Sequence, residues 1–162
     1  MAVTTRNTYI EANIDTVFAY LADVDRHLEW SGELSFGLQT LRKVTPGPLK
    51  VGSVFKSTGR LSYKAGVEDT STITDIIPPR YMTWETVSSG AWQENTFRWA
   101  YTMEPLREGT RLTYSLEARH FSPKPIQLWF PPILWLTDRK IFGKEMESGL
   151  RKIKLALEKH AF

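Results

Sequence analysis

Residues 96–104 read TFRWAYTME, and this stretch alternates large apolar side chains with polar ones. Side chains in a β-strand point alternately to the two faces of the sheet, so Phe97, Trp99, Tyr101 and Met103 share one face. Residues 112–118 repeat the alternation in the next stretch. Two adjacent strands with one apolar face and one polar face predict an antiparallel sheet with one buried face and one face exposed to solvent.

Working outward, the other stretches rich in β-branched and aromatic residues also predict strands, separated by short turns that contain Gly or Pro. The predicted strands are residues 3–12, 34–44, 54–63, 67–77, 81–87, 92–104 and 110–120. Consecutive strands joined by short turns form an antiparallel meander. The residues expected to line its inner face are Phe55, Tyr63, Trp84, Phe97, Trp99, Tyr101 and Tyr114.

Helical periodicity appears twice. Residues 13–22 and 23–29 predict two short helices after the first strand, with Trp30 at the end of the second. Near the C-terminus Met146, Leu150, Ile153 and Leu157 recur at helical spacing, which predicts a long helix from about Pro132 almost to the end of the chain. The predicted fold class is therefore α+β: a curved antiparallel sheet of about seven strands around a long C-terminal helix, in one domain over residues 1–162.

Gly149 lies on the apolar stripe of this helix, where a glycine costs about 1 kcal/mol relative to alanine. Two explanations remain open. The missing side chain allows close packing against a bulky ring, or it leaves empty volume between the helix and the sheet. Trp30, Met146 and Gly149 join the inner sheet residues as the predicted ligand-binding set.

Composition excludes several classes of function. The chain of 162 residues has no cysteine, a net charge of +3 and 12% aromatic residues, including six tryptophans. These values exclude a disulfide scaffold and a cysteine nucleophile, and they give no basic cluster that would indicate a nucleic-acid partner. Neither a signal peptide nor a membrane-spanning stretch is visible, so we expect a cytoplasmic protein.

Six short motifs in order resemble the START / polyketide cyclase–dehydrase superfamily (SRPBCC), whose shape is called the helix-grip fold. They are IDTVFAYLAD at 14–23, EW at 29–30, VGSVF at 51–55, IIPPRYMTW at 76–84, GTRLT at 109–113 and GLRKIK at 149–154. The resemblance covers nearly the whole chain. It implies a cavity between the sheet and the last helix, while the motifs themselves are structural and say little about chemistry.

Few groups are available for catalysis. His27, beside Glu29 and Trp30, and His120, on the strand parity of Tyr114, could act as general acid or base if they face the cavity. Glu29 beside an apolar wall could act as a general base. For each of the three, an ordinary structural or solvated role is the alternative. The three histidines lack the spacing of a metal site, and no cofactor is predicted.

We consider three functions. The first is binding of a small hydrophobic or polycyclic molecule, such as a lipid, quinone or polyketide, in the aromatic cavity. The second is an aromatase/cyclase-type enzyme with one or two acid–base groups, and the third is a co-chaperone-like interaction domain. The apolar segment Leu128–Leu136, within the longer stretch Pro123–Leu136, is expected to pack on the sheet edge or to form a lid or a dimer contact.

Overall fold

The computed structural model describes residues 3–31, 38–59, 68–89, 94–121 and 142–159. These residues contain a sheet of seven strands in the order β1-β7-β6-β5-β4-β3-β2, with every neighbouring pair antiparallel. The strands are β1 (Val3–Ile10), β2 (Leu38–Lys43), β3 (Val54–Gly59), β4 (Asp69–Ile77), β5 (Tyr81–Ser89), β6 (Glu94–Leu106) and β7 (Gly109–Phe121). The predicted meander is confirmed from β2 to β7, and β1 pairs with β7 at the far edge.

The register of the sheet joins the predicted apolar positions into rows. Tyr101 lies between Met82 of β5 and Tyr114 of β7, and Trp99 lies between Trp84 and Leu116. Directly opposed residues in an antiparallel pair place their side chains on the same face, so each row is continuous across three strands. The alternation in residues 96–104 and 112–118 therefore predicted the inner face correctly.

The alternation breaks at one position near the end of β7. Ala118 pairs with Phe97, but His120 pairs with Thr96, which leaves Arg119 as an extra residue between the two pairs. An extra residue of this kind is a β-bulge, and it shifts the two-residue alternation by one position. The parity that connected His120 with Tyr114 therefore does not extend through Arg119.

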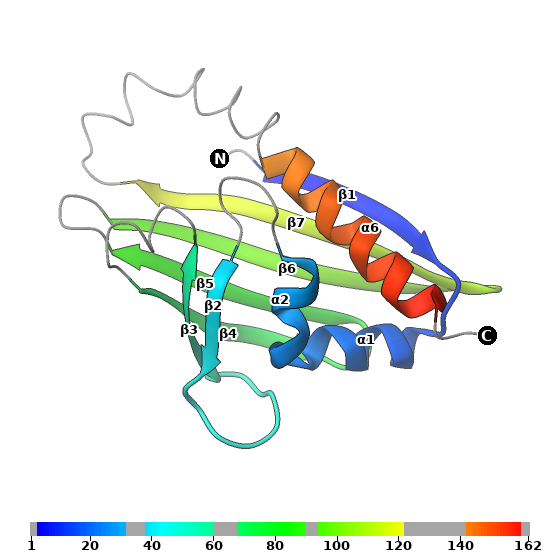
Figure 1. Ribbon diagram of the computed structural model, residues 1–162, viewed down its shortest axis with the longest axis horizontal. Helices are drawn as coiled ribbons and strands as arrows, with labels where there is room; N and C mark the ends of the chain where they lie inside the picture. The colour runs from blue at the N-terminus through cyan, green and yellow to red at the C-terminus, as the bar shows by residue number, and fades with distance from the viewer. Residues whose placement is uncertain (1–2, 32–37, 60–67, 90–93, 122–141, 160–162) are drawn as a thin grey trace.

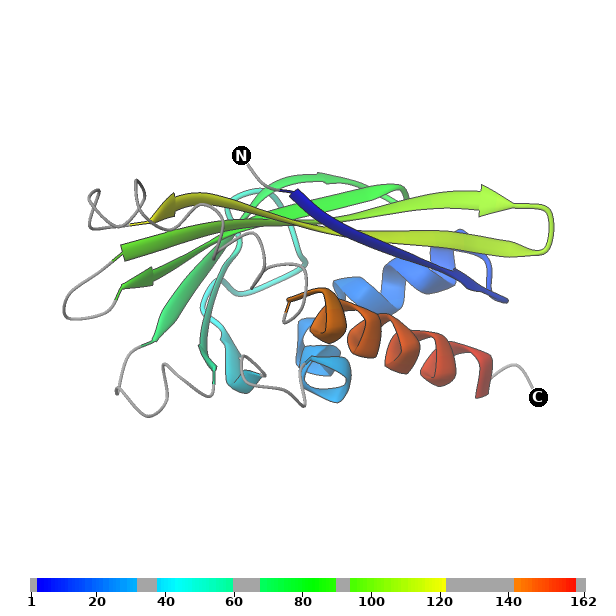
Figure 2. The ribbon, with the colours of Figure 1, turned by 90° about the horizontal axis from the view of Figure 1, so that it is seen from above.

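The described helices all lie on one side of the sheet (Figures 1 and 2). They are α1 (Ile14–Ala22), α2 (His27–Trp30) and α6 (Gly143–Lys159), and a 3-10 turn at Val24–Arg26 connects the first two. The predicted second helix is thus divided into that turn and a single α-helical turn. The part of the predicted C-terminal helix at residues 132–141 lies outside the described residues.

Helix α6 packs its apolar stripe onto the sheet, as its periodicity predicts. Met146, Leu150, Ile153 and Leu157 are all buried. Polar contacts tie the exposed flank of the helix to β1: Arg6 donates to Glu147 at 2.6 Å, and Lys154 donates to the carbonyl oxygen of Tyr9 at 2.7 Å. The helix is therefore held across the β1 edge of the sheet (Figure 2).

Candidate functional site

Four rings from β5, β6 and β7 form a continuous layer on the inner face of the sheet. Trp84 and Trp99 stack with ring centroids 6.4 Å apart and planes 12° apart, and Trp99 stacks on Tyr114 at 5.8 Å. Tyr101 lies 5.3 Å from Trp84 and 4.6 Å from Tyr114. The register described above produces this layer, because each ring is a cross-strand or diagonal neighbour of the others.

The single turn of α2 adds two more rings to the layer. The indole of Trp30 meets Tyr101 edge to face, with centroids 5.8 Å apart. The imidazole of His27 lies 4.6 Å from Trp30 and 6.3 Å from Trp84. A helix of one turn thus places both side chains against the sheet, next to Gly149 of α6.

The side chains of the layer are more deeply buried at one end than at the other. Tyr101, Tyr114 and Trp30 are buried, whereas Trp84, Phe97 and Trp99 are only half-buried. Phe97 continues the layer beyond Trp99, at 6.3 Å, and reaches Phe142 at 6.2 Å. The layer therefore has a closed end at Tyr101 and Trp30 and an accessible end at Trp84, Trp99 and Phe97.

Two polar atoms at the closed end have no hydrogen-bond partner among the residues that the structure describes. They are the Nε1 of Trp30 and the hydroxyl oxygen of Tyr101. Burial, followed by interaction with Tyr114, raises the pKa of Tyr101 well above its usual value. By distance and angle the hydroxyl of Tyr101 has no hydrogen-bond partner in the described part of the chain, so its O–H can donate to another group.

His27 is a neutral imidazole at physiological pH. Its Nε2 lies 2.9 Å from the carbonyl oxygen of Leu21, which can only accept, so Nε2 carries the proton. Burial lowers the pKa of His27, against smaller opposing effects of this hydrogen bond and of Asp23. The proton on Nε2 leaves Nδ1 with a free lone pair.

Glu29 lies in a different environment from its neighbours His27 and Trp30. Its carboxylate accepts a hydrogen bond from the hydroxyl of Tyr20 at 3.1 Å and lies 3.9 Å from Arg26, and 55% of its side chain is exposed. Burial and the hydrogen bond to Glu29 raise the pKa of Tyr20 to about 12. The apolar wall that the sequence suggested for Glu29 is absent, and α2 directs Glu29 and His27 to different partners.

The space beside Gly149 is occupied. A Cβ atom built there would lie 3.4 Å from the carbonyl oxygen of Trp30 and 3.7 Å from its indole ring. These are ordinary van der Waals contacts: Trp30 packs beside Gly149, which argues against empty volume there, but a methyl group would still fit, so close packing does not require the glycine. Met146 and Phe55, also predicted to bind ligand, are buried members of the same core.

Three other predictions lie outside what the structure describes. Tyr63 and the segment Pro123–Leu136 belong to residues that are not described, and for His120 only the backbone is described. Within the described residues no group of three or more histidine or acidic side chains could hold a metal ion. No helix in the described part of the chain is both long and apolar enough to cross a membrane.

Residues 1–158 match the family described as polyketide cyclase / dehydrase and lipid transport. The chain belongs to this family. Its fold is similar to the di-domain ARO/CYC StfQ from the steffimycin biosynthetic pathway, with a TM-score of 0.72 and 14% identity over 98% of this chain and 52% of StfQ. A conserved protein from Geobacillus kaustophilus gives a TM-score of 0.68 and 15% identity over 98% and 96% of the two chains.

Protein MLL2253 from Mesorhizobium loti has the same TM-score of 0.68, with 13% identity over 99% of this chain and 100% of its own. No curated protein matches this chain. Identities this low establish the shared fold alone, so the site has to be argued from the residues of this protein.

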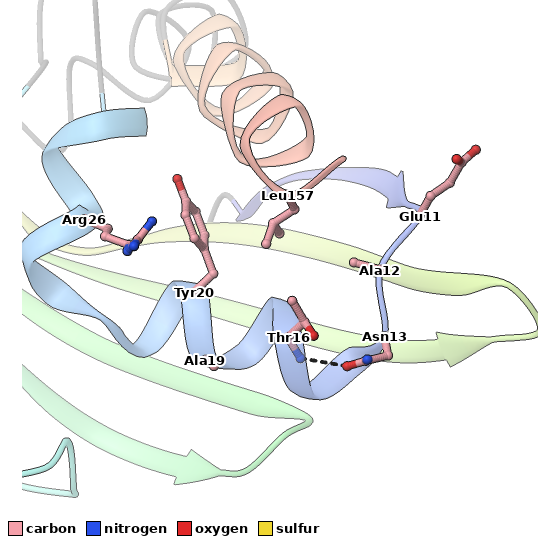
Figure 3. Close-up of a pocket in the computed structure, with 8 residues that line it drawn as sticks. All are labelled: Glu11, Ala12, Asn13, Thr16, Ala19, Tyr20, Arg26 and Leu157. Carbon is pink, nitrogen blue, oxygen red and sulfur yellow. Dashed lines mark hydrogen bonds between the residues drawn. The ribbon is translucent and has the colours of Figure 1, made fainter. Parts of the chain in front are cut away.

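A groove away from the aromatic layer was not predicted from the sequence. It is an open groove of about 510 Å³ between α1 and the C-terminal end of α6 (Figure 3). It is lined by Glu11, Ala12, Asn13, Thr16, Ala19, Tyr20, Arg26 and Leu157. Two of its polar side chains already have partners, since Arg26 pairs with Asp23 at 3.1 Å and the side chain of Asn13 caps α1 at 2.8 Å. No residue of the aromatic layer lines this groove. Its walls lie far apart in the sequence, so no local motif could have indicated it.

Proposed function

We propose that this protein binds a small hydrophobic, ring-containing ligand against the aromatic layer of its sheet. The observation that carries the proposal is the half-buried end of that layer, where Trp84, Trp99 and Phe97 form one contiguous surface. Large aromatic surfaces left partly uncovered inside a fold are typical of ligand sites.

The chemistry of the layer favours flat rings. Aromatic pairs gain about 0.5–1.5 kcal/mol beyond the burial of area when they meet offset or edge to face. Burial itself contributes roughly 2.5 kcal/mol for each 100 Å² of apolar surface removed from water. A ligand of two or three fused rings gains from both contributions, whereas a flexible chain gains mainly from the second.

The family supports the same class of ligand. Its description combines polyketide cyclases and dehydrases with lipid transport, which are activities on hydrophobic molecules. StfQ, which shares the fold, is an ARO/CYC protein of a biosynthetic pathway. Lipids, quinones and polyketide-like polycyclic compounds are therefore the candidates within this class.

A titration with fluorene, a flat hydrocarbon of three rings, tests the proposal. We expect saturable quenching of tryptophan fluorescence, and a loss of affinity of about tenfold or more in Trp84→Ala, because this ring contacts Trp99, Tyr101 and Tyr114. Leu106→Ala, which removes an exposed apolar side chain at the end of β6, is the control and should bind like the wild type. Failure of fluorene to bind saturably, or equal affinities of Trp84→Ala and the wild type, would refute the proposal.

An enzyme of the cyclase type is the second candidate, and His27 is the observation that favours it. A neutral imidazole with a free Nδ1, packed against Trp30 and Trp84, has the protonation state of a general base. If the protein turns over a substrate, His27→Gln should reduce kcat by about 100-fold or more while fluorene binding is retained. Turnover that survives His27→Gln unchanged would exclude His27 as the general base.

A further inference from the structure

The closed end of the aromatic layer contains two buried donors with nothing to donate to. The hydroxyl of Tyr101 and the Nε1 of Trp30 both lack a partner in the described part of the chain, and the two side chains are 0% and 4% exposed. Buried polar groups in folded proteins are nearly always hydrogen-bonded, because an unmade bond costs free energy. Two such groups on adjacent rings are therefore available to donate to a bound molecule.

Both groups can donate, and one of them can do nothing else. The indole nitrogen has a proton and no available lone pair. Burial holds the pKa of Tyr101 far above neutral pH, so its hydroxyl stays protonated. The hydroxyl could also accept, but the indole cannot, so a single ligand group that satisfies both has to be a hydrogen-bond acceptor.

The surrounding charges favour an uncharged acceptor. Burial raises the pKa of Tyr114, the ring next to Tyr101; the interaction with Tyr101 lowers it by less, and the negative charge of Glu145 adds a smaller increase. The cation on the inner side of β1, Arg6, is already paired with Glu147. A carboxylate or phosphate brought here would lose its hydration and would lie near the negative charge of Glu145.

We propose that Tyr101 and Trp30 determine the specificity of this site by donating to an uncharged carbonyl oxygen on the ring-containing ligand. The proposal deepens the proposed function and rests on it. The ligand class that fits is an aromatic ketone or quinone, placed with its oxygen at the closed end and its rings on Trp84 and Trp99. An unsubstituted hydrocarbon of the same shape would leave both donors unpaired.

The test compares 9-fluorenone with fluorene, because the two differ by one carbonyl oxygen on the same three rings. We expect the wild type to bind fluorenone about tenfold or more tighter than fluorene, since a site built to donate hydrogen bonds discriminates against an analogue without the acceptor. Tyr101→Phe removes only the hydroxyl and should bring the two affinities within about threefold of each other. Tyr81→Phe, a matched change on a tyrosine whose hydroxyl lies near Arg98 instead, should keep the full preference.

Binding of fluorene is the internal control for each variant. If Tyr101→Phe binds fluorene like the wild type and loses only the preference for fluorenone, the donor role is supported. If the wild type binds both probes equally, or Tyr101→Phe keeps the full preference, the donor role is overturned while the aromatic site stands. If neither probe binds to the wild type, the proposed function itself fails and the donor role fails with it.

Discussion

At the scale of single residues, His27 is a titratable group that the fold removes from water. Burial lowers its pKa in the folded state, so the unfolded chain takes up the proton first as the pH falls. The neutral form therefore stabilises the fold fully above about pH 6.5, the ordinary histidine value, and this stabilisation is lost progressively below it. The free energy of unfolding should fall between pH 7.5 and pH 5.5.

Urea unfolding at these two pH values measures the effect. His27→Gln has no proton to take up at this position, so its stability should change less than that of the wild type over the same interval. An identical loss in both proteins would mean that His27 is not desolvated in the folded state.

Gly149 and Gly143 give a second prediction at this scale, because their surroundings differ. Gly149→Ala places a methyl group at van der Waals distance from Trp30 and should raise stability by up to about 1 kcal/mol, the helix propensity gained. Gly143→Ala would collide with the guanidinium of Arg6, which must move and weaken its pair with Glu147, so it should gain less or lose stability. Thermal unfolding of the two variants distinguishes them, and a clear loss in Gly149→Ala would contradict the packing described.

The rings of the site could be predicted residue by residue, but the directions of its polar side chains could not. Strand parity correctly placed Trp84, Trp99, Tyr101 and Tyr114 on one face, because a regular strand has a strict period of two. The same reasoning does not carry to His120, since a bulge at Arg119 intervenes and no sequence signal announces it. The sequence also suggested an apolar wall beside Glu29. The direction of this side chain depends on how the single turn of α2 packs, which the sequence does not reveal.

At the scale of elements, the first helix depends on its N-terminal cap. The side chain of Asn13 accepts from the backbone N–H of Thr16 at 2.8 Å. Asn13→Ala should destabilise the protein by about 1 kcal/mol, which for a chain of this size lowers Tm by roughly 2–4 °C. Asn13→Asp keeps an acceptor at the same place and should retain most of the wild-type Tm. Equal Tm values for the alanine variant and the wild type would show that the cap contributes nothing.

The C-terminal end of α6 is attached to β1 through Glu158. The backbone N–H of Glu11 and then Lys154 lower the pKa of this carboxyl, so its contribution is present above about pH 4.5 and is lost below it. Glu158→Gln should therefore lower stability at pH 7, by less than about 1 kcal/mol because the pair is partly exposed, and the deficit should be smaller at pH 3. Asp25→Asn, an exposed carboxylate in the 3-10 turn, is the control for charge alone. A deficit in Glu158→Gln that is equally large at both pH values would exclude the ionised pair as its cause.

At the scale of the whole molecule, the order of elements followed from the sequence because each had its own periodicity. Alternation identified the strands, and the spacing of Met146, Leu150 and Ile153 identified the helix that covers them. What periodicity cannot provide is the docking between distant segments. The contact of Trp30 with Gly149 and the groove that joins Glu11 to Leu157 arise only when the chain has folded.

The central claim is that the inner aromatic layer of the sheet receives a ring-containing ligand. The most direct measurement is a ¹H–¹⁵N spectrum of the tryptophan indole groups during a titration with fluorenone, with signals assigned through single Trp→Phe variants. The indole resonances of Trp30, Trp84 and Trp99 should shift together and saturably, with Trp30 moving most because its Nε1 gains a hydrogen bond. Saturating fluorenone that leaves these three resonances unchanged would contradict the claim.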